Sequence, residues 1–227
     1  MTLRDTTVRK FTKRIEGLIS NHGELKLAIH NKRNEAVLEN ELVVQFVLQA
    51  AVLWESFQND IILAYIEKSP SKALTSLEER IKQSVEDKFG KSCRRAITFS
   101  RPGNLTRTVL ASLLDQKGWN ISVKDAERLS TNANTLLASR FAKKFSLDRD
   151  DSEFYDYAIS LRNYLSHYSS DAKSELKKKI GALCEPTNAP LKAQLRTIEG
   201  YLKAHGGTAT TRAVFVVERM KQIAAKL

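Results

Sequence analysis

Residues 41–69 read ELVVQFVLQAAVLWESFQNDIILAYIEKS, and this stretch does most to decide the fold class. Apolar side chains recur in it at the three- and four-residue spacing of one helix face, at Val43, Phe46, Val47, Ala50, Leu53, Trp54, Phe57, Ile61 and Ala64. The apolar stripe is wide enough to pack against two neighbouring elements at once. The sequence therefore predicts a long central helix buried in the core of the protein.

Helical patterns also extend on both sides of this central helix. Glycine and proline, which form turns and end helices, number only 9 and 4 in the whole chain. This scarcity favours an all-α fold over an all-β fold, which needs frequent turns. We expect further helices over residues 7–38, with a weak point at 21–23, and over 71–89, 104–116, 123–144 and 150–170, the last continuing to 182.

The clearest linker is the sequence EPTNAP at residues 185–190. Two helical patterns follow it, over residues 191–205 and 208–227, and Gly206 and Gly207 separate them. We expect one helical domain over residues 1–184, with the carboxyl-terminal helical pair of residues 185–227 packed on it.

The chain is basic, with 37 Lys and Arg against 26 Asp and Glu, a formal charge of +11. A charge of this size favours anionic partners such as nucleic acid, and it is equally typical of a solvated basic surface that keeps a protein soluble.

The cysteines and the apolar segments indicate where in the cell we expect the protein. Cys93 and Cys184 lie far apart and have no zinc or disulfide spacing, so we expect free thiols in a reducing cytoplasm. The charged start of the chain does not resemble a secretory signal, and the charge-free stretch 42–54 is too short to span a bilayer. We therefore expect a cytoplasmic protein that does not insert into membranes.

The segment 88–107 carries six basic residues and no acidic one. It also holds β-branched residues, Phe99 and a Pro-Gly turn, so we expect a loop or short irregular insert. Such a loop could follow an RNA backbone, with Phe99 stacking on a base, and a solvated loop is an equally good interpretation. Its candidate RNA-binding residues are Arg94, Arg95, Arg101 and Arg107.

The stretch DDSEFYDYAISLRNYLSHYSS at residues 150–170 separates into two faces on an ideal helix. One arc has the width of a core-facing stripe and holds Phe154, Tyr157, Ala158, Leu161, Leu165 and Tyr168. The opposite face is polar and holds Arg162, Asn163, Ser166 and His167, joined by Tyr155 and Asp156. We expect the first face in the core and the second in a cleft or against a partner.

The polar groups on this face suit cleavage of RNA. The Arg162 guanidinium offers a planar set of donors that match phosphate oxygens, and His167 can exchange a proton near neutral pH. Asn163 could orient the imidazole or bind phosphate, and Ser166 could donate a further hydrogen bond. A ribonuclease that uses the substrate's own 2′-hydroxyl needs such groups and no metal or other cofactor.

Two further residues are candidates for a supporting role, Tyr155 on the polar face and Glu55 on the central helix. Glu55 either orients Arg162 or reaches solvent at the edge of its helix, and its position beside Trp54 leaves both interpretations open. We slightly favour solvent for Glu55. The four histidines are too scattered for a metal site.

The string RNYLSH at residues 162–167 resembles the signature of the HEPN superfamily, an Arg followed by a polar residue and then by His after four to six residues. AVLWESFQNDII, residues 51–62, is similar to the early helix of the RiboL-PSP-associated group within that superfamily. The resemblance spans roughly residues 42–170. It implies a helical bundle, here with additional carboxyl-terminal helices, that forms a homodimer in which two Arg-His helices face each other.

The resemblance also implies a function, a metal-independent endoribonuclease that acts as a toxin or defence effector, with RNA as substrate and an antitoxin protein as a possible partner. The alternative is a catalytically inactive HEPN module that binds RNA, nucleotide or a partner protein. A third interpretation is an unrelated helical DNA-binding or scaffold protein, but no helix-turn-helix pattern is recognisable. The sequence has no H-E-x-x-H, phosphate-binding glycine loop or G-x-S-x-G, which argues against metalloproteases, nucleoside triphosphatases and serine hydrolases.

Overall fold

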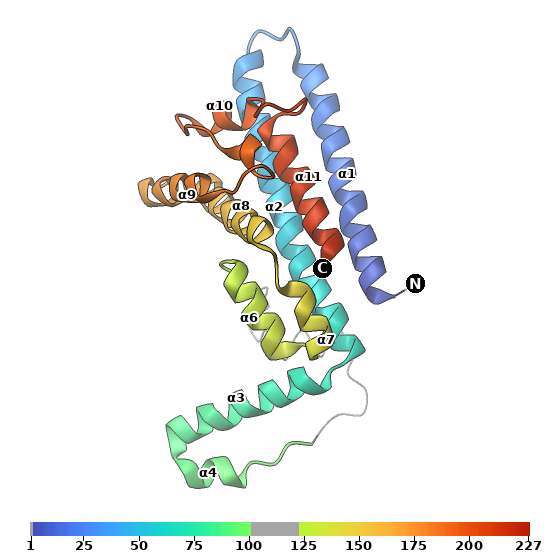
Figure 1. The fold of residues 1–227 in the computed structure, drawn as a ribbon, viewed down its shortest axis with the longest axis vertical. Helices are drawn as coiled ribbons and strands as arrows, with labels where there is room; N and C mark the ends of the chain where they lie inside the picture. Colours follow the sequence, from blue (N-terminus) through green and yellow to red (C-terminus); the bar gives the residue numbers. More distant parts are fainter. Residues whose placement is uncertain (1, 101–122) are drawn as a thin grey trace.

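The computed structural model describes residues 2–100 and 123–227, and in these residues the protein is all-α, with helices and no strand. Three long helices lie side by side along the longest axis of the molecule (Figure 1). They are α1 (Leu3–Ile29), α2 (Glu35–Lys68) and α11 (Arg212–Lys226). The predicted all-α fold class is confirmed.

Helix α2 is the centre of the core, because α1, α8 (Arg149–His167), α10 (Ile198–Lys203) and α11 all pack against it. The predicted apolar stripe is buried along most of its length, including Trp54 and Phe57. Phe11 of α1 packs against both of these rings, with its centroid 4.6 Å from that of Phe57 and 5.7 Å from that of Trp54. The prediction of a long central helix is confirmed.

Helix α1 has no break at residues 21–23, so the predicted weak point there is wrong. The His22 ring stacks on Phe46 of α2 at a centroid distance of 4.1 Å, and this packing favours continued helix despite the local sequence. The chain turns instead at Asn31, which has a φ of 63°, and the Glu35 carboxylate accepts a hydrogen bond from the Asn31 backbone N–H at 2.7 Å.

By length and composition alone, α2 is also long and apolar enough to cross a membrane, and it is the one such helix in the described part of the chain. The core helix of a soluble protein has the same properties, so this is weak evidence. In this structure Trp54, Ile61 and Ile62 of α2 are buried by other helices of the same chain.

Helices α3 (Ser71–Phe89) and α4 (Lys91–Ala96) form an arm at one end of the molecule (Figure 1). They meet at Gly90, whose φ of 86° is a conformation that side chains rarely adopt. The expected loop over residues 88–107 is therefore wrong where α4 lies. The predicted helix over 104–116 falls outside the described residues.

The predicted single helix over residues 123–144 is wrong, because the structure has three shorter elements there. They are α6 (Ala126–Leu136), α7 (Ser139–Ala142) and the 3-10 helix η1 (Lys143–Phe145). The chain is extended at Leu137, and both Leu136 and Leu137 are buried. A straight helix would turn these two side chains about 100° apart, so the change of direction serves the core.

The predicted helix over residues 150–170 is confirmed as α8, but it does not continue to 182. Tyr168 adopts a left-handed conformation, with a φ of 50° and a ψ of 25°, and ends α8. Helix α9 (Ser170–Ala182) then begins in a new direction, and the Ser169 hydroxyl caps it by accepting from the Ala172 backbone N–H at 3.2 Å. The two helices pack against each other as a hairpin.

After α9 the chain forms the short η2 (Ala189–Leu191), then α10 and α11, so the predicted helix over 191–205 is wrong except for the residues of α10. The Arg212 guanidinium fixes this irregular segment. Its Nε donates to the Pro190 carbonyl at 2.7 Å, and its plane lies over the Tyr201 ring. Helix α11 shares the same hydrophobic core as α1, α2 and α8.

A buried ion pair joins α8 to α11. The Asp151 side chain is only 1% exposed, and its Oδ1 accepts from Arg219 Nη2 at 2.7 Å. Lys226 Nζ contacts the other carboxylate oxygen. Because the Asp151 carboxylate has left water, these two cations are what compensate for its lost hydration.

We expect the Asp151→Ala substitution to lower the free energy of unfolding by about 3–5 kcal/mol, since it leaves Arg219 buried without its partner. Urea unfolding followed by circular dichroism measures this change. The matched control is Arg149→Ala on the same helix, which removes a side chain that is 83% exposed and pairs with the partly buried Glu153, and it should destabilise the protein much less. Equal losses in the two variants would contradict this account.

Candidate functional site

The Arg162 side chain lies against Glu55 of α2. Arg162 Nε is 3.0 Å from Glu55 Oε1, and a weaker contact of 3.5 Å joins Nη2 to Oε2. Arg162 Nη1 also donates to Asn163 Oδ1 at 3.2 Å. Glu55 therefore contacts Arg162, which is the interpretation that we favoured less, and its side chain is still 31% exposed.

Tyr155 does not share the polar face, and its predicted place there is wrong. Its side chain is fully buried, and its hydroxyl donates to Gln58 Oε1 of α2 at 2.6 Å. Burial raises the pKa of Tyr155 well above its usual value, which keeps the phenol protonated and able to donate. α8 is sandwiched between helices, so it buries more than the single arc that an amphipathic pattern predicts.

The Gln58–Tyr155 and Glu55–Arg162 contacts together set the position of α8 on α2. Residues 55 and 58 are one helical turn apart on α2, and residues 162 and 155 are two turns apart on α8 in the opposite order. The two helices therefore run in opposite directions where they meet. The deeper contact is buried and the outer contact is partly open, with the Arg162 side chain 34% exposed.

Ser166 and His167 are exposed in the last turn of α8, as is Asn163 one turn earlier. Among the residues that the structure describes, no hydrogen bond or ion pair engages the Ser166 or His167 side chain. Tyr168 was expected in the core and is instead 53% exposed, because the helix ends there and the left-handed backbone directs this ring outward over Tyr164.

The structure thus brings together only part of the predicted site. Glu55, Arg162 and Asn163 form one contacting cluster. On an ideal helix His167 lies about 140° around the axis from Arg162, and in this structure no contact joins the two. A ligand that touches both residues must lie across the exposed end of α8 or be shared with a second molecule.

Asp156, the other polar residue placed on this face, ties neighbouring helices to α8. Its Oδ1 accepts from the Ala126 backbone N–H at the start of α6, at 2.8 Å. Its Oδ2 pairs with Lys179 Nζ of α9 at 3.0 Å. Asp156 therefore supports the scaffold around the exposed end of α8.

The candidate RNA-binding arginines of the basic segment divide into three groups. Arg94 pairs with Glu86 at 2.8 Å and with Glu79 at 3.0 Å, which fastens α4 to α3. Arg95 is exposed and has no partner among the described residues. Arg101 and Arg107 lie outside the described residues.

The α3–α4 arm and the end of α8 do not form one surface. In Figure 1 the α3–α4 arm lies below α6 and α7, whereas α8 and α9 lie above them. The structure therefore does not bring Arg94 or Arg95 to Arg162 and His167. An RNA that reached both regions would have to extend along the molecule.

Comparison with known proteins adds no second line of support, since no protein-family model, no curated protein and no solved structure matches the chain. The similarity to HEPN proteins therefore depends on residues 51–62 and 162–167 and stays a prediction.

We expect Arg94→Ala to accelerate hydrogen exchange of the α4 backbone amides by about tenfold, because a helix of six residues is not stable without tertiary contacts. Exchange followed by mass spectrometry on peptides covering residues 91–96 measures this effect. The matched control, Arg95→Ala, removes the same charge from an exposed side chain and should leave exchange unchanged. Equal acceleration in both variants would show that the Arg94 ion pairs do not hold α4.

Proposed function

We propose that this protein is a metal-independent endoribonuclease of HEPN type that cleaves RNA through attack by the substrate's own 2′-hydroxyl. The observation that carries the proposal is the arrangement at the end of α8. There, Glu55 holds the Arg162 guanidinium in a fixed plane, while His167 is exposed on the same helix.

Arg162 retains donors for a phosphate group. A guanidinium has five N–H donors, and the contacts with Glu55 and Asn163 use one on each of its three nitrogens. One donor on each of Nη1 and Nη2 is left to bind oxygens of a phosphate group.

His167 is suited to proton transfer. In the proposed reaction the 2′-oxygen forms a bond to phosphorus while the bond from phosphorus to the 5′-oxygen breaks. The products are a 2′,3′-cyclic phosphate and a 5′-hydroxyl. A base must accept the 2′-hydroxyl proton, and an acid must protonate the leaving 5′-oxygen. Histidine performs either role near neutral pH, while Arg162 stabilises the negative charge that develops on the phosphate oxygens.

Glu55 acts as a positioning residue in this proposal. It fixes the direction of the Arg162 guanidinium before substrate binds, which lowers the entropy lost when the complex forms. The Glu55 carboxylate also neutralises part of the positive charge of Arg162. A bound phosphate would therefore share the guanidinium with Glu55.

The same ion pair favours the second candidate, an inactive HEPN module that binds RNA, nucleotide or a partner protein. An arginine already neutralised by a carboxylate can serve as a fixed structural contact without taking part in catalysis. Retained cleavage activity distinguishes the two candidates. A toxin or defence role and a neutralising antitoxin belong to the first candidate and rest on the HEPN resemblance, whereas the cytoplasmic location rests on the two cysteines and the charged start of the chain.

We expect the purified protein to cleave single-stranded RNA in the presence of EDTA, and His167→Ala and Arg162→Ala each to reduce kcat/KM at least about a hundredfold. Gel analysis of a labelled RNA measures the rate, and the cyclic phosphate end identifies the reaction. Both substitutions lie outside the core, so circular dichroism should show unchanged folding.

Matched controls show whether a loss of activity comes from the proposed site or from the removal of any histidine or any positive charge. His205→Ala removes another exposed histidine, and Arg149→Ala removes an exposed arginine from the same helix. Both should retain the activity of the unmodified protein. Wild-type cleavage by either site variant would reject the assignment, and strict dependence on added Mg²⁺ or Mn²⁺ would reject the mechanism.

The proposed chemistry favours a homodimer. One copy of the site supplies one proton carrier that works near pH 7, whereas the reaction uses one group to accept a proton and another to donate one. A two-fold axis beside the exposed end of α8 would bring a second Arg162 and His167 to the same site, and a two-fold dimer is the commonest homo-oligomer.

We expect a dimer by sedimentation at working concentration, and partial rescue of cleavage when inactive His167→Ala subunits are mixed with inactive Arg162→Ala subunits. The rescue is partial because each mixed dimer holds one intact histidine and one intact arginine. The control mixes His167→Ala with the doubly substituted Arg162→Ala/His167→Ala protein, which restores no histidine. A monomer that cleaves RNA at the full rate would contradict the shared site.

A further inference from the structure

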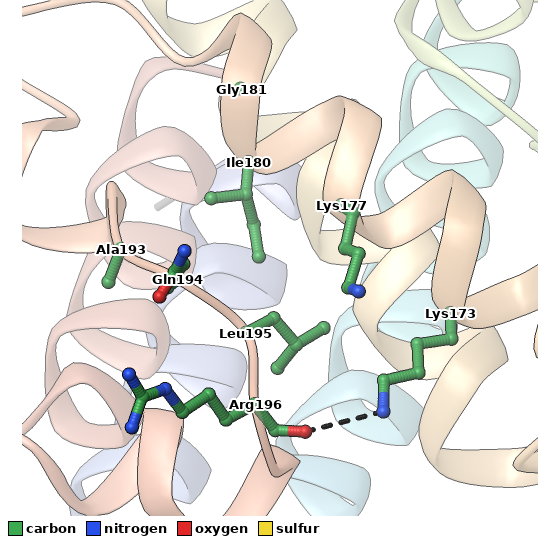
Figure 2. Close-up of a pocket in the computed structure, with 8 residues that line it drawn as sticks. All are labelled: Lys173, Lys177, Ile180, Gly181, Ala193, Gln194, Leu195 and Arg196. Carbon is green, nitrogen blue, oxygen red and sulfur yellow. Dashed lines mark hydrogen bonds between the residues drawn. The ribbon is translucent and has the colours of Figure 1, made fainter.

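A pocket of about 630 Å³ lies between α9 and the irregular segment that precedes α10 (Figure 2). Its volume is in the range of small-ligand sites. Lys173 and Lys177 extend from α9 into it, and Ile180 and Leu195 form an apolar floor. The Arg196 guanidinium extends away from the two lysines, so Arg196 borders the pocket through its backbone.

Within residues 2–100 and 123–227, no carboxylate pairs with either lysine of the pocket. Two other lysines of α9 are paired, Lys178 with Glu175 and Lys179 with Asp156. Lys173 Nζ donates to the Arg196 carbonyl at 3.3 Å, which uses one of its three donors. Lys177 has no partner among the residues that the structure describes.

Lys173 and Lys177 are four residues apart, so their ammonium groups lie on the same side of α9 and repel each other. An anion between them would relieve this repulsion. Ile180 and Leu195 are buried beneath the pocket, at 5% and 6% exposure, and together with Gly181 and Ala193 they line it with apolar atoms. A ligand that fits carries a negative group for the lysines and an uncharged group against the apolar lining, and a nucleotide has both.

The pocket is also close to the proposed site along the chain. Lys173 follows His167 by six residues, which span at most about 21 Å even when fully extended. The turn at Tyr168 and Ser169 makes the path shorter. A strand of a few nucleotides is long enough to span this distance.

We propose that this pocket binds one phosphate, with its base, of a single-stranded RNA whose scissile bond lies at Arg162 and His167. The proposal rests on the proposed ribonuclease function for the direction of the strand, whereas the phosphate site itself is defined by Lys173 and Lys177. These two residues are binding residues that do not take part in the chemistry.

The test measures the binding of a short single-stranded RNA carrying 2′-O-methyl groups, which the protein cannot cleave because its 2′-oxygens have no proton to lose. Fluorescence anisotropy gives the dissociation constant at a series of salt concentrations. Each phosphate of a single strand that the protein neutralises adds about 0.7 to the slope of log affinity against log salt. Because one phosphate lies between the two lysines, we expect Lys173→Gln/Lys177→Gln to reduce the slope by about 0.7 and Lys177→Gln alone to reduce it by a part of that amount.

The matched control is Lys178→Gln, which makes the same change of charge one residue further along, at a lysine paired with Glu175. Its slope should equal that of the unmodified protein. Equal slope changes in Lys177→Gln and Lys178→Gln would overturn the proposal that RNA binds in the pocket. Only the overall positive charge of the protein would then attract RNA. If adenosine monophosphate binds as tightly as the oligonucleotide, and this binding depends on Lys177, the pocket binds a free nucleotide. That result would overturn the proposal that the ligand is an RNA strand.

This experiment separates the pocket from the ribonuclease proposal, because the probe reports binding without cleavage. A lower slope in Lys177→Gln together with an inactive wild-type protein would retain the pocket and reject the enzyme. Active wild-type protein with equal slopes in the two glutamine variants would retain the enzyme and reject the pocket.

Discussion

Glu55, Gln58, Tyr155 and Arg162 form the polar seam between α2 and α8, and the candidate site depends on it. Inside the core, a buried hydroxyl without a partner would cost about 1–3 kcal/mol, so the Tyr155–Gln58 hydrogen bond favours one register of α8 on α2. That register places Glu55 opposite Arg162 at the outer edge of the same contact. The direction of the guanidinium is thus set by the packing of two helices that are about a hundred residues apart in the sequence.

The fold class followed from apolar spacing, because a long, evenly spaced stripe such as that of residues 43–64 has few structural solutions other than a buried helix. Local patterns could not place the ends of shorter helices. Leu137 breaks a helical pattern to bury its side chain, and Tyr168 ends α8 without a glycine or proline. In both places tertiary packing or a rare backbone conformation overrides local propensity.

The candidate site could be predicted only in part for a related reason. A helical-wheel pattern assigns one apolar arc, whereas α8 has neighbours on several sides and buries Tyr155 from its polar face. The partner of Arg162 is distant in the sequence, and a carboxylate between apolar residues gives no sign of which cation it will meet. The acidic stripe of Glu79 and Glu86 on α3 was a readable signal that Arg94 would be paired. The cleavage assays test the activity, whereas the HEPN assignment stays a prediction from residues 51–62 and 162–167.

The left-handed conformation of Tyr168 has a consequence for mutational tolerance. Glycine and asparagine enter this backbone region with little strain, whereas valine, isoleucine and threonine are strongly disfavoured there. The backbone conformation at position 168 therefore limits the choice of residue there more than the contacts of the side chain do. In related chains that end this helix at the same place, we expect glycine or asparagine to replace Tyr168. We expect these two residues even though another aromatic residue is chemically more similar to tyrosine.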